Sequence, residues 1–208
     1  MDLGRIVCFW MPLVFRIKKV YVSEKAKERI NGGAVLVSNH TGFTDPLVLG
    51  CTVWYRRMFF LVAEVVMQKK LIAPLLRGMG CIEINRNICD MNAIRKSISI
   101  LSEGHLMTVF PQGGIVRDDS MESIKSGVVL MALRAKVQIV PVYIHKKDSY
   151  YKRNCVVIGE PITDHFPKEG GFPSMADMDK YTETVLKKMT ECKDYFIKMA
   201  ESEKNGNN

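Results

Sequence analysis

The sequence predicts an α/β fold in which a mostly parallel central sheet is flanked by helices. Short runs of apolar and β-branched residues alternate with longer segments of helical periodicity along most of the 208 residues. The run at 34–37 is apolar at every position, which is typical of a strand buried on both faces. With 47% hydrophobic and 25% charged residues, a chain of this length can form one domain with a sizeable core.

The predicted strands and helices alternate from residue 34 onward. Strands are expected at 34–37, 58–62, 81–84, 106–110, 137–144 and 155–158. Helices are expected from residue 45 and over 65–77, 91–102, 124–135 and 175–202. Pro111 ends the strand at 106–110, and the run at 155–158 is interpreted as an edge strand followed by a linker.

The last predicted helix has the clearest periodicity. Apolar residues recur on it in steps of three and four, at Met178, Tyr181, Val185, Met189, Cys192, Phe196 and Met199. We expect this stripe to pack on the sheet, and the alternative is a contact with a membrane or a partner.

Charge and cysteine usage restrict the class of protein. The net charge is +8, and residues 1–90 hold 13 basic against 7 acidic residues. No nucleic-acid-binding motif accompanies this charge, so an anionic membrane surface or a phosphate-bearing substrate fits better. The six cysteines form no zinc or disulfide spacing, so we expect reduced thiols in a cytoplasmic compartment, no metal and no bound cofactor.

The N-terminus carries an apolar run at 6–15, flanked by Arg5 and by Arg16, Lys18 and Lys19. It is about half as long as the ~20 residues that span a bilayer, and no signal-peptide cleavage pattern follows it. We interpret residues 1–30 as an interfacial segment, and the alternative is a helix packed on the core. Residues 31–204 would form the domain and 205–208 a disordered tail.

The run Ser38-Asn-His-Thr-Gly-Phe-Thr-Asp-Pro46 contains a candidate catalytic pair. His40 follows a predicted strand, and Asp45 with Pro46 is suited to the start of a helix, with Asp45 as its N-cap. Asp45 can accept a hydrogen bond from the proton on one ring nitrogen of His40, which fixes the tautomer and leaves the other nitrogen free to deprotonate a hydroxyl. The alternative is an ordinary loop histidine beside a helix cap.

Three further blocks follow in order: Gly80-Cys-Ile-Glu-Ile-Asn-Arg86, Phe110-Pro-Gln-Gly-Gly-Ile115 and Val140-Pro-Val-Tyr-Ile144. With Asn39, His40 and Asp45 they resemble the motifs of the glycerolipid acyltransferase superfamily, typified by bacterial 1-acyl-glycerol-3-phosphate acyltransferases. Those motifs are Asn-His-x4-Asp, Gly-x-Ile-x-Ile-Asn/Asp-Arg, Phe-Pro-Glu-Gly-Thr-Arg and a Val-Pro-Val strand. The resemblance covers residues 34–144.

The resemblance implies acyl transfer from acyl-CoA or acyl carrier protein to a hydroxyl of a lysophospholipid such as 1-acyl-glycerol-3-phosphate, in phospholipid biosynthesis. His40 would be the general base and Asp45 would steady the imidazolium. No acyl-enzyme is required. The enzyme would work peripherally on the cytoplasmic face of a membrane, held by residues 6–15 and by a basic face at Arg56, Arg57, Lys69 and Lys70.

The resemblance also implies substrate-binding residues: Asn39, Arg86, Gln112, Gly113, Gly114, Arg117 and Lys125. Arg86 would bind an acceptor phosphate, and the alternative is a surface ion pair with Asp90 or Glu83. Gly113-Gly114 would let backbone amides approach an oxyanion or phosphate, and the alternative is a tight turn. Arg117 and Lys125 would be solvated charges if they do not contact substrate.

Two residues depart from the family pattern. Gln112 stands where the family has Glu, and Ile115 where it has Arg, so the acceptor-binding block lacks one charge of each sign. An amide can hydrogen-bond a hydroxyl but cannot act as an acid. The alternatives are a non-phosphate acceptor, such as a glycolipid or a glycosylated terpenoid, or a non-catalytic protein that binds lipid or carrier.

Overall fold

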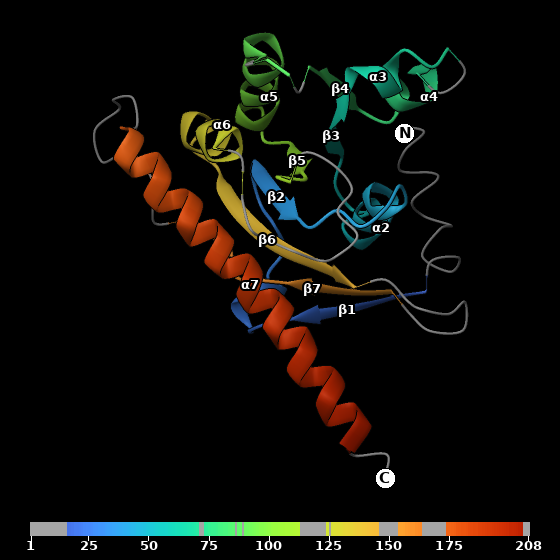
Figure 1. Ribbon diagram of the computed structural model, residues 1–208, viewed down its shortest axis with the longest axis vertical. Coiled ribbons are helices and arrows are strands. Elements are labelled where there is room, and N and C mark those ends of the chain that lie inside the picture. The colour runs from blue at the N-terminus through green and yellow to red at the C-terminus, as the bar shows by residue number, and fades with distance from the viewer. Residues whose placement is uncertain are drawn as a thin grey trace.

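The computed structural model describes residues 16–70, 73–85, 87–88, 90–112, 124, 126–145, 154–163 and 174–205. In this part of the chain seven strands form one sheet, in the order β1-β7-β6-β2-β5-β3-β4 (Figure 1). They are β1 (Ile17–Tyr21), β2 (Ala34–Ser38), β3 (Met58–Ala63), β4 (Cys81–Ile84), β5 (Leu106–Val109), β6 (Gln138–His145) and β7 (Asn154–Ile158). Every neighbouring pair is parallel except β6 with β7. The predicted fold class is confirmed.

The helices follow the predicted order. They are α2 (Asp45–Thr52), α3 (Glu64–Met67), α4 (Ala73–Gly78), α5 (Met91–Ser102), α6 (Gly127–Ala135) and α7 (Met175–Asn205), with a short 3₁₀ helix at Lys25–Lys27. The single helix expected over 65–77 is instead two short ones. Pro74 lacks a backbone N–H and disfavours helical geometry at the residue before it, which opposes a continuous helix.

Strand β1 was not predicted. It pairs in parallel with β7, from Ile17 opposite Asn154 to Tyr21 opposite Ile158. The strand expected at the edge, β7, therefore lies inside the sheet, and residues 17–21 belong to the sheet rather than to a separate segment ending at residue 30. The two lysines of β1 suit an exposed edge strand. The apolar run at 6–15 lies outside the described residues.

The sheet is buried on both faces because side chains of its central strands alternate between two cores. Val35 and Val37 of β2 pack in the cluster that includes residues of α5, α6 and α7. Ala34 and Leu36 pack in the other cluster, with residues of α2. Figure 1 shows the same division, with α5, α6 and α7 on one side of the sheet and α2 on the other.

The apolar stripe of α7 packs on the sheet, as predicted. Val185, Met189 and Cys192 are buried. Towards the ends of the stripe, Met178 and Tyr181 pack against the first core and Phe196 and Met199 against a third cluster, which contains Tyr143. Among the described residues, no helix combines the length and the apolar content needed to cross a bilayer.

Candidate active site

The predicted catalytic residues lie where parallel strands end at one edge of the sheet. The loop containing His40 follows β2, and Gln112 lies three residues after β5, the strand paired with β2. Ile144 is near the end of β6, which pairs with β2 on its other side. Because carboxyl ends of neighbouring parallel strands meet, three separate segments converge on one place.

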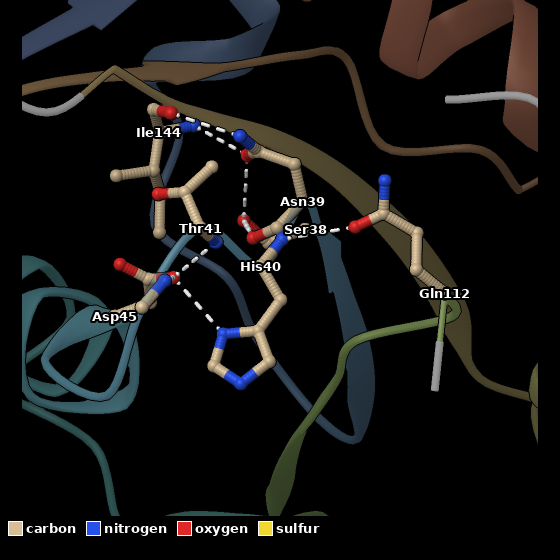
Figure 2. A network of polar contacts seen from close by, with 8 residues as sticks. Ser38, Asn39, His40, Thr41, Asp45, Gln112 and Ile144 are labelled. Atoms are coloured by element: carbon tan, nitrogen blue, oxygen red, sulfur yellow. Dashed lines mark hydrogen bonds and ion pairs between the residues drawn. The ribbon is translucent and has the colours of Figure 1, made fainter. Parts of the chain in front are cut away.

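His40 and Asp45 form the predicted pair. The Nδ1 of His40 lies 2.9 Å from Oδ2 of Asp45 (Figure 2). The same oxygen accepts hydrogen bonds from the backbone N–H of Thr41 at 2.7 Å and of Gly42 at 2.8 Å. The Asp45 side chain is fully buried, while that of His40 is 13% exposed. These amides stabilise the buried carboxylate charge next to the imidazole.

The contact between Nδ1 of His40 and Asp45 determines which ring nitrogen carries the proton. An ionised carboxylate can only accept hydrogen bonds, so Nδ1 carries the proton and Nε2 is left with a lone pair. In Figure 2 the second ring nitrogen points away from Asp45 and from the other residues drawn. The arrangement can therefore accept a proton from a hydroxyl placed at Nε2.

The prediction that Asp45 caps a helix is wrong. Helix α2 starts at Asp45 itself, its N-cap position is Thr44, and no side chain caps it. The carboxylate instead closes the turn through Thr41 and Gly42 and holds His40. A local sequence pattern indicates a helix start but does not reveal this turn.

The segment after β5 holds His40 from two other directions. The ring of Phe110 stacks on the imidazole, with centroids 4.1 Å apart and an angle of 21° between the planes. The backbone N–H of His40 donates to Oε1 of Gln112 at 3.1 Å. The neutral amide of Gln112 thus acts on the position of the histidine.

Asn39 connects the same loop to β6. Its Nδ2 donates to the carbonyl of Ile144 at 2.9 Å, and its Oδ1 accepts from the N–H of Ile144 at 2.7 Å. The residue is only 1% exposed. The family resemblance implies a substrate-binding role for Asn39, but both polar atoms of its amide bond to β6, as in a residue that positions the loop.

An apolar cavity of about 370 Å³ adjoins the histidine through Phe110. It is lined mainly by apolar side chains at the ends of β3, β4 and β5 and on α5 and α6, including Leu61, Ile84, Ile94, Val109, Val128 and Met131. This cavity is not predicted from the sequence. Its only signal was the run of apolar residues at the ends of three strands, which equally indicates ordinary core.

The loop that follows β4 is fixed by Asp90. One carboxylate oxygen accepts from the N–H of Asn85 at 3.1 Å, and the other from those of Asn92 and Ala93 at the start of α5. The hydrogen bond from Ala93, followed by that from Asn85, lowers the pKa of Asp90 below its ordinary value. Asp90 is therefore the N-cap of α5, and the alternative of an ion pair with Arg86 stays open because Arg86 lies outside the described residues.

The predicted acceptor-binding residues other than Asn39 and Gln112 lie outside the described residues. They are Arg86, Gly113, Gly114, Arg117 and Lys125. Their roles remain predictions.

Arg56 does not belong to the basic face that the sequence suggested. Its guanidinium donates to the carbonyls of Ile30 at 2.6 Å and Gly32 at 2.9 Å, and also to that of Gly104. These carbonyls precede β2 and β5, so Arg56 lies at the amino edge of the sheet, opposite His40. Lys69, in contrast, follows the carboxyl end of β3.

Burial makes three of the cysteine thiols poor nucleophiles. It raises the pKa of Cys81 and Cys155 to about 11 and that of Cys192 to about 12. These thiols are protonated at neutral pH, and only the thiolate is strongly nucleophilic.

A sequence model of the family described as Acyltransferase matches residues 18–145, more than half of the chain. A 1-acyl-sn-glycerol-3-phosphate acyltransferase of Bacillus subtilis is 25% identical over 178 residues, covering 83% of this chain and 86% of that protein. A probable 1-acyl-sn-glycerol-3-phosphate acyltransferase of Mycoplasma pneumoniae is 32% identical over 141 residues, covering 64% of this chain. That match spans only 53% of the Mycoplasma protein.

The fold is also similar to a solved structure. The crystal structure of PlsC, the 1-acyl-sn-glycerophosphate acyltransferase of Thermotoga maritima, superimposes with a TM-score of 0.64 and covers 92% of this chain. The match spans 78% of that protein at 19% sequence identity. At this identity the likeness concerns the fold.

Proposed function

We propose, because this chain belongs to the acyltransferase family, that it moves a fatty acyl group from a thioester donor to a hydroxyl of a lysophospholipid. The acceptor we propose is 1-acyl-glycerol-3-phosphate, and the donor is acyl-CoA or acyl carrier protein. The names of the Bacillus and Mycoplasma relatives support acyl transfer in lipid synthesis. The observation that carries the proposal is the His40–Asp45 pair, with Nε2 of His40 left to accept a proton.

The reaction proceeds by direct transfer. Nε2 of His40 takes the proton of the acceptor hydroxyl as its oxygen attacks the thioester carbonyl. The carbon–sulfur bond then breaks, and the imidazolium returns its proton to the departing thiolate. Asp45 stabilises the imidazolium between these steps, and such base assistance contributes about 10²- to 10⁴-fold to the rate.

The apolar cavity supports a long-chain substrate. Its walls are mainly aliphatic, and Phe110 belongs both to the cavity lining and to the stack on His40. An acyl chain lying in the cavity would bring its carbonyl, or the glycerol next to it, towards the imidazole. Burying each methylene of the chain contributes about 0.8 kcal/mol.

The test is transfer by the purified full chain. Labelled acyl-CoA and acyl carrier protein are each offered with lysophosphatidate and with phosphate-free lysolipids and glycolipids, and His40→Ala is the control. Transfer to lysophosphatidate by the wild type and not by His40→Ala supports the proposal. Transfer only to a phosphate-free acceptor would overturn the acceptor, and no transfer to any of them would favour a non-catalytic binding protein.

Gln112 provides a finer test of the acceptor. Gln112→Glu keeps an oxygen that can accept from the His40 N–H, and it adds the charge that the resemblance associates with phosphorylated glycerol. We expect a several-fold higher rate on lysophosphatidate, with Gln112→Ala as the control that loses the hydrogen bond. An unchanged or lower rate for Gln112→Glu would count against this acceptor.

A further inference from the structure

Three exposed apolar side chains project from the edge of the sheet that carries His40. Phe43 follows β2 and is 86% exposed, Val65 in α3 follows β3 and is 71% exposed, and Ile88 follows β4 and is 65% exposed. We refer to Phe43, Val65 and Ile88 as the apolar rim. Single exposed apolar residues are common on soluble proteins, so their common position is the informative feature.

The topology places the apolar rim along one edge. Strands β2, β5, β3 and β4 are neighbours in that order, and each pair is parallel. Segments that follow these strands therefore emerge side by side. The segment after β5, which holds His40 through Gln112, emerges between Phe43 and Val65.

Positive charge accompanies the apolar rim. Lys69 and Lys70 are exposed just after α3, and Arg77 is exposed on α4. Figure 1 shows α3 and α4 beside β4 at the end of the sheet. The acidic residue of this segment, Glu64, accepts a hydrogen bond from Asn85 at 3.0 Å. Apolar tips beside lysines form the pattern of a surface that lies on anionic lipid.

The cavity reaches the same edge. Ile88 lines the cavity although most of its side chain is exposed, so it lies where the cavity meets the surface. An acyl chain that leaves a bilayer at this point would pass from lipid into the cavity with little exposure to water.

We propose that the apolar rim, together with Lys69 and Lys70, docks the catalytic domain onto an anionic lipid surface with the cavity opening towards the bilayer. The use of this surface for substrate delivery rests on the function proposed above, whereas the docking itself does not. Docking through this edge is independent of any contact made by residues 1–15.

The first test is sedimentation of the full chain with phosphatidylcholine vesicles, with and without about one-third phosphatidylglycerol. The triple variant Val65→Ser/Lys69→Glu/Lys70→Glu should bind the anionic vesicles at least tenfold more weakly. The matched control Lys187→Glu/Lys198→Glu, which changes two exposed lysines of α7, should stay within twofold of the wild type. Equal losses in both variants would overturn the proposal, since charge alone would then explain them.

The second test detects contact between residue 65 and lipid directly, so that strong binding by residues 1–15 cannot conceal the result. Brominated lipid should quench the added fluorescence of Val65→Trp on vesicles and should not quench that of Lys187→Trp. Lack of quenching at residue 65 would overturn the proposal.

Activity assays distinguish a failure of the docking proposal from a failure of the proposed function. The triple variant should keep its rate on detergent-dispersed substrates and lose it on vesicles. If it binds vesicles normally but loses transfer from acyl carrier protein, the surface binds the carrier and the lipid proposal is wrong. If the wild type transfers no acyl group while Val65→Trp is quenched, the proposed function fails and the docking surface stands.

Discussion

His40 and Arg56 lie at opposite edges of the same pair of strands, β2 and β5, and each connects the segments next to both strands. At the amino edge, Arg56 donates to carbonyls that precede β2 and β5. At the carboxyl edge, His40 follows β2 and is held by Phe110 and Gln112 after β5. The guanidinium of Arg56 donates to backbone carbonyls, whereas Nδ1 of His40 is held by Asp45 and the second ring nitrogen points away from the residues drawn in Figure 2. Arg56 thus supports the fold, whereas His40 is the residue that we propose acts on the substrate.

Replacing His40 should give the largest effect on activity and a small one on stability. His40→Ala removes the base and should lower kcat about 10³-fold, because general-base assistance contributes on the order of 10²- to 10⁴-fold. Steady-state transfer assays check the rate, and thermal unfolding checks that the variant is folded. Retention of a tenth of the wild-type rate would rule out His40 as the base.

Replacing Arg56 should do the reverse. Arg56→Ala leaves carbonyls at the start of two central strands without their charged donor, and we expect the free energy of unfolding to fall by about 3 kcal/mol. Urea unfolding measures the change. Arg57→Ala, which removes a cation lying over the Phe59 ring, is the control and should cost less than about 1 kcal/mol. Similar losses of unfolding free energy in Arg56→Ala and Arg57→Ala would contradict the role of Arg56 in maintaining the fold.

A smaller effect, on the pH dependence of stability, is expected from Asp90 in the loop after β4. Folding lowers the pKa of Asp90, so its carboxylate adds stability above its unfolded pKa of about 3.9. That contribution is lost as the pH falls through the lower folded value. We therefore expect Asp90→Asn to be less stable than the wild type at pH 7 and the gap to narrow below about pH 4. Asp194→Asn, an exposed change on α7, should show no such narrowing in the same urea titrations.

Local patterns in the sequence predict part of the fold and of the site. The buried run at 34–37 and the spacing of His40 and Asp45 are local patterns, and both gave correct predictions of strand and pair. Strand β1 was missed because two of its five residues are lysines, which resemble the basic flank of an apolar segment. Its pairing with β7 depends on residues more than a hundred positions away.

Long-range contacts explain the other differences between the predicted and the observed site. Nothing near Asn39 in the sequence indicates that its amide bonds to Ile144, 105 residues later. The Arg56 contacts and the apolar cavity likewise need segments that only the folded sheet brings together. The motif located the His40–Asp45 pair, but the contacts that hold this pair in place come from the topology.

The central claim is that His40 takes a proton from the substrate's own hydroxyl, so that no acyl group passes through the protein. The most direct measurement is rapid-quench analysis of the full chain mixed with radiolabelled acyl donor in the absence of acceptor. We expect no label bound covalently to protein, with label moving to lipid only when lysophosphatidate is added. Stoichiometric, acceptor-chaseable label on the protein would contradict it.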